Sequence, residues 1–137
     1  MALDIEFGYT GQIVRVNLSK KEIFEEKYTP DDRKKWIGGT GLGATIIWEE
    51  VLGEVSWDSP ANKFIFATGP LTGTGFNGAG GFSLVGKGPM TNLAGCSQAH
   101  GYFGAYLKFC GFDALIIEGA SFKWIYLLID DGRVSIR

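Results

Sequence analysis

The sequence predicts an α+β domain in which β-hairpins, short helices and further strands follow one another, and three observations support this class. First, Val14, Val16 and Leu18 alternate with polar residues, which is the period-2 pattern of a half-buried strand. Second, residues 42–52 and 102–110 place apolar side chains at helical spacing. Third, a hairpin pattern like the first returns near the end of the chain.

The remaining elements lie between turn and capping signals. Thr29 is expected as the N-cap of a first helix, because Pro30 suits the first helical position and two acids follow it. That helix is expected to be short, since two glycines follow Trp36 and Ile37. In order, the expected elements are hairpin strands at 14–18 and 23–28, a helix starting at 30, a helix at 42–52, strands at 63–68 and 82–85, a helix at 102–110, a strand at 114–118, and hairpin strands at 124–129 and 134–137.

The last hairpin indicates an internal duplication. Its turn, Asp130-Asp131-Gly132, is a strong hairpin signal, and its strands resemble the opening ones. We therefore expect duplicated β-hairpin/helix/sheet units, a first at 1–121 and the start of a second at 122–137. A chain that stops inside the second unit is expected to be truncated, as part of a longer protein.

Composition excludes several classes of function. With 137 residues, 45% of them hydrophobic and 20% charged, the chain suits one folded domain and is too apolar for a disordered tail. Its net charge of −2 argues against nucleic-acid binding. Apolar runs such as 124–129 are far shorter than the roughly 20 residues that a bilayer needs, so no membrane association is expected. Residues 1–7 lack a secretory-signal pattern, and the two cysteines, Cys96 and Cys110, are too few for a disulfide framework, so a cytoplasmic location is expected.

The middle of the chain has an unusual charge distribution. None of the 15 acidic residues lies between 59 and 112, yet this segment contains 12 of the 21 glycines and the only histidine, His100. It also contains three lysines, Lys63, Lys87 and Lys108.

Two interpretations of this segment remain open. A glycine-rich backbone can place successive N–H groups around an anion, and residues 95–101 lead directly into the helix expected at 102–110, whose N-terminal dipole would strengthen the attraction. Alternatively, the segment is a buried central part of the domain, where charges are excluded and glycines allow close packing.

Better-known motifs match only in part. Residues 81–88 fit G-x-x-x-x-G-K, but Gly88 replaces the Ser or Thr that binds magnesium, and the expected strand lies inside the motif. Residues 39–44 fit G-x-G-x-x-A, but a charged helical segment precedes them instead of a strand. His100 has no nearby carboxylate for a triad, and the two cysteines do not have the spacing of a zinc site. No catalytic constellation is therefore expected within the chain.

Five stretches that occur in order along nearly the whole chain carry a resemblance to a known family. The stretches are Gly11-Gln-Ile-Val-Arg-Val-Asn-Leu, Trp36-Ile-Gly-Gly-Thr-Gly-Leu-Gly, Gly69-Pro-Leu-Thr-Gly-Thr, Gly101-Tyr-Phe-Gly-Ala-Tyr-Leu-Lys-Phe and Gly111-Phe-Asp-Ala-Leu-Ile-Ile-Glu-Gly. In these stretches the chain resembles the N-terminal domain of the tungsten-containing aldehyde:ferredoxin oxidoreductases.

The resemblance implies a duplicated α+β domain that forms the base for a tungsten (or molybdenum) bis-pterin cofactor. In such enzymes a magnesium ion bridges the pterin phosphates, which agrees with the anion interpretation above. Family members oxidise aldehydes to carboxylic acids and pass electrons through a [4Fe–4S] cluster to ferredoxin, and they often form homodimers. The cluster cysteines and the catalytic carboxylate and histidine lie outside this chain, so the chain's partners would include the rest of a longer enzyme, and the chain alone is expected to be inactive.

The resemblance also implies which residues would bind the cofactor. The glycine-rich loop of the family ends in Gly-Gly-Arg, and its arginine position falls on Gly81, next to Gly80, so that guanidinium is missing here. The family segment Asn-Ser-Gly-Gly aligns with Gln98, Ala99, His100 and Gly101. A backbone carbonyl from Gln98 would serve the magnesium as the family asparagine does, and His100 replaces a glycine that approaches the pterin.

These departures leave three hypotheses. The first is the cofactor-binding part of a tungstopterin aldehyde oxidoreductase. The second is the same family with a different redox substrate, such as an aromatic compound or an acyl thioester. The third is a stand-alone binding or scaffold domain that has lost the metal.

Overall fold

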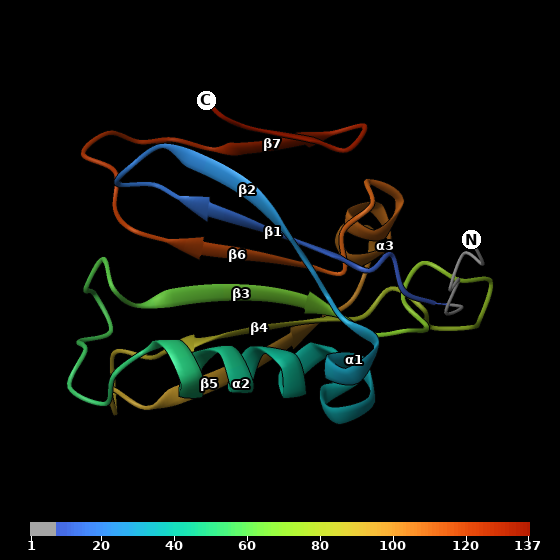
Figure 1. Cartoon of the computed structure of the whole chain (residues 1–137), viewed down its shortest axis with the longest axis horizontal. Coiled ribbons are helices and arrows are strands. Elements are labelled where there is room, and N and C mark those ends of the chain that lie inside the picture. The colour runs from blue at the N-terminus through green and yellow to red at the C-terminus, as the bar shows by residue number, and fades with distance from the viewer. Residues whose placement is uncertain (1–7) are drawn as a thin grey trace.

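The computed structural model describes residues 8–137, which form three helices and eight strands (Figure 1). Residues 1–7, where the sequence shows no secretory signal, lie outside the described residues. In chain order the elements are β1 (Gln12–Asn17), β2 (Glu22–Lys27), α1 (Pro30–Trp36), α2 (Gly39–Glu50), β3 (Lys63–Thr68), β4 (Phe82–Lys87), β5 (Ala94–Ala99), α3 (Tyr102–Phe109), β6 (Ala114–Glu118), β7 (Leu127–Asp130) and β8 (Arg133–Ile136).

Six of the strands form one mixed sheet in the order β2-β1-β6-β3-β4-β5, and β7 and β8 form a separate two-stranded sheet. Strands β1 and β6 run parallel, with Val14 opposite Leu115, and the other neighbours in the large sheet are antiparallel. Helices and a mixed sheet in one domain confirm the predicted α+β class. The division into units at 1–121 and 122–137 stays a prediction.

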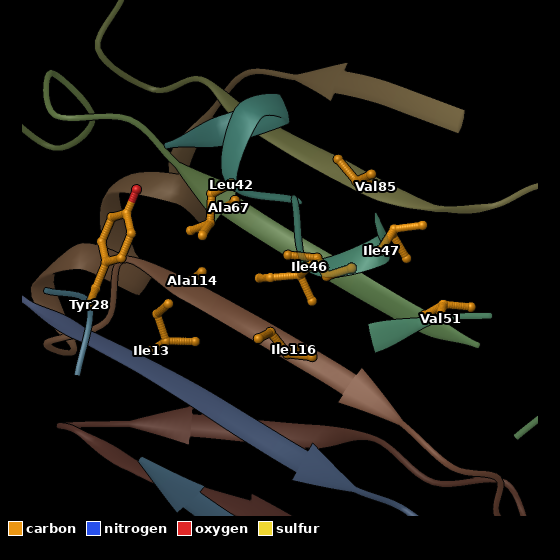
Figure 2. Close-up of a cluster of buried hydrophobic side chains, with 11 residues drawn as sticks. Ile13, Tyr28, Leu42, Ile46, Ile47, Val51, Ala67, Val85, Ala114 and Ile116 are labelled. Atoms are coloured by element: carbon orange, nitrogen blue, oxygen red, sulfur yellow. The ribbon is translucent and has the colours of Figure 1, made fainter. Parts of the chain in front are cut away.

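The large sheet is covered on both faces. On one face, α2 lies across β3 and β4 and buries Ile46 and Ile47 against Val85 and Ile116 of the sheet (Figure 2). On the other face, Leu107 of α3 and the inner side chains of the β7–β8 hairpin pack on the sheet. The strands of the sheet centre therefore contribute side chains to two cores, as their alternation requires.

Helix α2 lies unusually close to the sheet because of one glycine. A Cβ atom added to Gly43 would come within 2.5 Å of a methyl carbon of Val85 on β4. Glycine is a poor helix former, so packing against the sheet has to stabilise this helix.

At the end of the sheet where β3 begins, the buried Arg15 and Lys63 form a network with partly exposed carboxylates. Arg15 of β1 donates to Glu50 of α2 at 2.7 Å and to Glu26 of β2 at 3.0 Å, and Lys63 of β3 pairs with Glu118 of β6. Burial alone would raise the pKa of Glu118, but hydrogen bonds from Lys63 and Asn17 and the nearby positive charges lower this pKa below its ordinary value. The pKa of Glu50 is lowered in the same way, because hydrogen bonds from Arg15 outweigh its burial. This network ties α2 and four strands together.

The structure corrects several expected boundaries. Residues 95–101 were expected to lead into α3 as a loop, but residues 94–99 form β5, an exposed edge strand paired with β4. Its small and polar residues have weak strand preference, so the open edge of β4 decides their conformation. Helix α2 begins at Gly39 instead of 42 and α3 ends at Phe109. In the last hairpin, the first strand is shorter than expected, and the second has the expected length but begins one residue earlier, at Arg133. In residues 8–137, no helix has the length and apolar character needed to span a membrane.

Candidate cofactor site

Two helices begin at the same end of the large sheet. Strand β3 ends there at Thr68, β4 begins at Phe82 and β5 ends at Ala99. Helix α2 starts beside this end on one face, and α3 starts directly after β5 (right-hand side of Figure 1). The glycine-rich segment 69–81 connects β3 to β4 at the same place.

Neither helix N-terminus is capped by a side chain. The N-cap residues are Gly38 and Gly101, neither makes a side-chain capping hydrogen bond, and neither helix has an acidic residue in its first turn. The first N–H groups of an α-helix have no partner within the helix, and the helix dipole gives them partial positive charge. Both helix starts are therefore suited to an external anion.

Close backbone contacts explain why glycine is needed here. A Cβ atom on Gly38 would lie 2.3 Å from the carbonyl oxygen of Thr68, and one on Gly80 would lie 2.4 Å from that of Gly101. Gly38 and Gly101 also have φ angles of +142° and +121°, which side chains rarely permit. The glycines of this segment thus serve both close packing and backbone conformation. The interpretation as a buried central segment fails for β5, which is exposed along its length.

Thr72 joins the two ends of the glycine-rich segment, a role that sequence reasoning missed. Its hydroxyl donates to the carbonyl oxygen of Gly81 at 2.8 Å and accepts from the N–H of Gly69 at 3.3 Å. The side chain is buried. The sequence signal that could have indicated this role is the place of Thr72 in the family-like stretch Gly69-Pro-Leu-Thr.

Two adjacent hollows lie at this end of the sheet. The first, here called the strand hollow, has a volume of about 210 Å³ and is lined by Gly39, Ala67, Gly69, Thr72, Gly81, Phe82, Ser83, Gln98, Ala99 and His100. The second, here called the loop hollow, has a volume of about 480 Å³ and is lined by Gly73, Thr74, Phe76, Gly78, Ala79, Gly80, His100, Gly101, Tyr102, Ala105 and Phe109. All six residues that the sequence singled out for cofactor binding line one of the two hollows.

Hydroxyl groups supply polar contacts beside the start of α2. The buried Ser83 and the exposed Thr40 share a hydrogen bond of 3.1 Å between their hydroxyl oxygens, and Thr40 lies 3.0 Å from the sulfur of Cys96. Neither hollow is lined by Asp, Glu, Lys or Arg among the described residues. An anion here would meet backbone N–H groups, hydroxyls, an amide and an imidazole.

The three lysines of the acid-free segment do not line the hollows. Lys63 pairs with Glu118, and Lys108 pairs with Asp113 at 2.5 Å. Lys87 donates to three backbone carbonyls after α2, those of Leu52, Gly53 and Val55. A buried ammonium group needs such partners, which explains why these charges are directed away from the hollows.

The donor set fits a phosphate better than a directly bound metal ion. In residues 8–137, no three His, Cys, Asp or Glu side chains gather closely enough to hold a metal. Gln98 lies on the edge strand β5, where part of the backbone has no strand partner and remains available to an external ligand. The glycine-lined hollows between two open helix starts therefore fit the phosphate groups of an organic cofactor.

Residues 13–137 match the family described as "Aldehyde ferredoxin oxidoreductase, N-terminal domain". The chain belongs to this family. It is 46% identical over 131 residues to the tungsten-containing aldehyde ferredoxin oxidoreductase of Pyrococcus abyssi, and 44% identical to that of Pyrococcus horikoshii. Both alignments cover 96% of this chain and 22% of the relative. The chain thus spans about a fifth of the length of these oxidoreductases and corresponds to their N-terminal part.

Two proteins with other names are also similar to this chain. The "Aliphatic sulfonate oxidoreductase, WOR-like subunit" of Pyrococcus furiosus is 35% identical over 136 residues, with 96% of this chain and 21% of the relative covered. A solved structure titled "Active site complex BamBC of Benzoyl Coenzyme A reductase in complex with 1,5 Dienoyl-CoA" matches with a TM-score of 0.92 and 35% identity, covering 96% of this chain and 20% of that chain. The family fold therefore occurs in enzymes named for several substrates.

Proposed function

We propose that this chain is the N-terminal part of a tungsten or molybdenum bis-pterin oxidoreductase, and that its two hollows hold the phosphate end of the cofactor. The observation that carries the proposal is the pair of uncapped helix starts, at Gly39 and Tyr102, beside glycine-lined hollows without carboxylates. Membership of a family with tungsten-containing relatives supports the choice of cofactor.

The residues of this chain would bind and orient the cofactor. The N–H groups at the starts of α2 and α3 would donate to phosphate oxygens, and Ser83 would add a hydroxyl. We propose that the backbone carbonyl of Gln98 would bind a magnesium ion beside the phosphates. Gly80, Gly81, Ala99 and Gly101 would let the ligand approach the backbone closely. When bound, the metal–pterin group would supply the redox chemistry, and the protein would supply position and electrostatics.

For the whole enzyme we propose oxidation of an aldehyde to a carboxylic acid. Water would supply the second oxygen and two protons would be released, while a [4Fe–4S] cluster outside this chain would pass the two electrons to ferredoxin. The identities of 44% and 46% to aldehyde oxidoreductases, against 35% to the sulfonate and benzoyl-CoA enzymes, support this choice. The free state of Cys96 and Cys110 supports a reducing, cytoplasmic location.

A second candidate substrate class comes from the solved structure. The TM-score of 0.92 to a benzoyl-CoA reductase complex favours reduction of an aromatic acyl thioester as the alternative. Assays of the full-length enzyme with aliphatic aldehydes and with aromatic acyl-CoA thioesters separate the two. Turnover of thioesters alone would overturn the aldehyde proposal.

We also propose that the rest of the longer enzyme covers an apolar groove of this domain. The groove has a volume of about 790 Å³ and lies between α3, β6 and β7, where Tyr106 and Phe109 are largely exposed. Exposed aromatic side chains in a groove of this size are typical of an interaction surface. The relatives supply a natural occupant, because about four-fifths of their length lies outside the matched part.

One pair of variants tests the cofactor site. Gly69→Asp places a carboxylate in the strand hollow, and Gly88→Asp places one at the opposite end of β4. A Cβ atom at either glycine meets nothing within 4 Å, so both positions have room for the start of a side chain. The chain is produced in hosts supplied with tungstate or molybdate, and retained metal and pterin are measured by mass spectrometry and by pterin fluorescence.

We expect Gly69→Asp to lose at least tenfold in retained pterin, because like charges repel at short distance, while Gly88→Asp retains the wild-type amount. Equal retention by the two variants would contradict the location of the site. A folded wild-type chain that never retains pterin would instead favour a metal-free scaffold.

A further inference from the structure

His100 occupies a special position between the two hollows. It follows the last residue of β5 and precedes the N-cap of α3, and it lines both the strand hollow and the loop hollow. Among the described residues, no other side chain lines both. A ligand that extends from one hollow into the other must therefore pass the imidazole.

The imidazole of His100 rests on the bare backbone of Gly81. A Cβ atom added to Gly81 would lie 3.3 Å from the ring carbon Cε1 and 3.4 Å from Nδ1 of His100. Contacts this short require one partner to shift by a few tenths of an ångström. The exposed imidazole is free to shift, so a methyl group at residue 81 would displace the ring at little cost to folding.

The two backbones that meet here are held in place. Gly80 packs against the carbonyl of Gly101 so closely that a Cβ would lie 2.4 Å from that oxygen, and Thr72 donates to the carbonyl of Gly81 at 2.8 Å. The position of the imidazole thus depends on its own torsion angles and on the absence of a side chain at residue 81.

His100 also differs from its surroundings in charge. No Asp, Glu, Lys or Arg lines either hollow among residues 8–137. The imidazole is therefore the group at this place that can carry a positive charge and donate to a phosphate oxygen through a ring N–H.

We propose that Gly81 and His100 act together as a phosphate-binding pair of this site. Gly81 leaves room for the imidazole, and the imidazole donates to a phosphomonoester group that lies between the two hollows. This inference rests on the proposed function, because it assumes that the hollows hold the phosphate end of a cofactor.

The role of His100 can be tested by NMR. Because the chain has one histidine, a single imidazole Cε1–H resonance reports on it, provided that no histidine tag remains. Inorganic phosphate with magnesium is the probe, and the full 137-residue chain is compared with His100→Asn, Gly81→Ala, His100→Gly and the double variant. In the histidine-free variants, amide shifts report binding. The denaturation midpoint of each variant is measured in parallel.

We expect phosphate to shift the imidazole resonance with saturation. Gly81→Ala should weaken phosphate binding at least fivefold with almost no change in the denaturation midpoint, and His100→Asn should weaken it similarly. In the His100→Gly background, Gly81→Ala should change the affinity less than twofold, because the displaced ring is already gone. Retained pterin should fall in both His100 variants.

Other outcomes overturn the inference in distinguishable ways. If phosphate moves the amides of Gly39 and Gly69 but leaves the imidazole resonance unchanged, the anion site stands and the role of His100 is wrong. If His100→Asn loses phosphate binding but retains pterin fully, the pair does not serve the cofactor. If neither phosphate nor pterin binds the wild-type chain, the proposed function fails together with the inference.

Discussion

The ammonium group of Lys108, in the last turn of α3, donates to a carboxylate oxygen of Asp113 at 2.5 Å, and both side chains are almost fully buried. Asp113 also accepts from the backbone N–H groups of Thr10 and Gly11, at 2.7 Å for Gly11. Lys108 donates in turn to the carbonyl of Gly8 at 2.5 Å. One buried ion pair thus fastens residues 8–11 to α3 and to the start of β6.

Breaking this pair should destabilise the domain strongly. Lys108→Met leaves the carboxylate of Asp113 buried without its counter-ion, so we expect the free energy of unfolding to fall by about 3–5 kcal/mol in urea titrations. Lys34 on α1 is exposed, so Lys34→Met is the matched control. It should change the free energy of unfolding by less than about 0.5 kcal/mol. Equal effects of the two substitutions would mean that the pair contributes little.

The network around Glu118 predicts a pH dependence of stability. Its pKa is lowered in the folded state, so the unfolded chain binds more protons between the lowered pKa and the ordinary value near 4.5. The contribution is therefore fully present above pH 4.5 and is lost as the pH falls through the lowered pKa. Denaturation midpoints measured from pH 7 to pH 3 should fall less steeply for Glu118→Gln than for the wild type. Parallel curves would show that Glu118 has the same pKa in both states.

Relieving strain at Ile37 should stabilise the domain. Ile37 has φ +61° and ψ −47°, and the N–H of Gly38 donates across it to the carbonyl of Trp36 at 2.6 Å, which defines a strained γ-turn. Ile37 is 60% exposed, so its side chain contributes little packing. Ile37→Gly should raise the free energy of unfolding by about 1 kcal/mol, since strain of about 1–3 kcal/mol outweighs the entropy cost of glycine. Ile37→Ala keeps a Cβ and should give no such gain, and a loss in Ile37→Gly would argue against strain.

The close approach of α2 to the sheet can be tested at Gly43. A methyl group there would overlap the side chain of Val85, so Gly43→Ala should cost about 1–3 kcal/mol although alanine favours helices. Gly53, just after α2, has open space around its Cα, and Gly53→Ala should be neutral within about 0.5 kcal/mol. Thermal denaturation of both variants checks the difference. A stable Gly43→Ala variant would show that α2 can move away from β4.

Much of the fold could be predicted from local patterns. The alternation at Val14 and Val16 and the cap at Thr29 were sufficient for the first hairpin and the start of α1, because burial and capping act on neighbouring residues. Strand β5 could not be predicted, since its small residues carry no strand signal and it forms by pairing with β4. The parallel pairing of β1 with β6 is equally invisible in local sequence.

The site was predictable in part. The lack of carboxylates and the glycines of residues 69–81 indicated the anion-friendly segment. The three lysines were misleading, because local sequence did not show that Lys63 and Lys108 would find carboxylates outside that segment, at Glu118 and Asp113. The contact between Gly81 and His100 depends on how β4 and β5 align, which only the structure supplies.

The pairing of Val14 with Leu115 has a consequence for the order of folding. Strand β1 joins the rest of the sheet through β6, which is made almost at the end of the described chain. During synthesis the β1–β2 hairpin leaves the ribosome first. The partner strand of β1 on its other side, β6, follows about a hundred residues later, so the apolar face of the hairpin stays exposed until then. Contacts between such distant segments slow folding and prolong exposure to aggregation. This domain should therefore complete its six-stranded sheet only after residue 118 has been released.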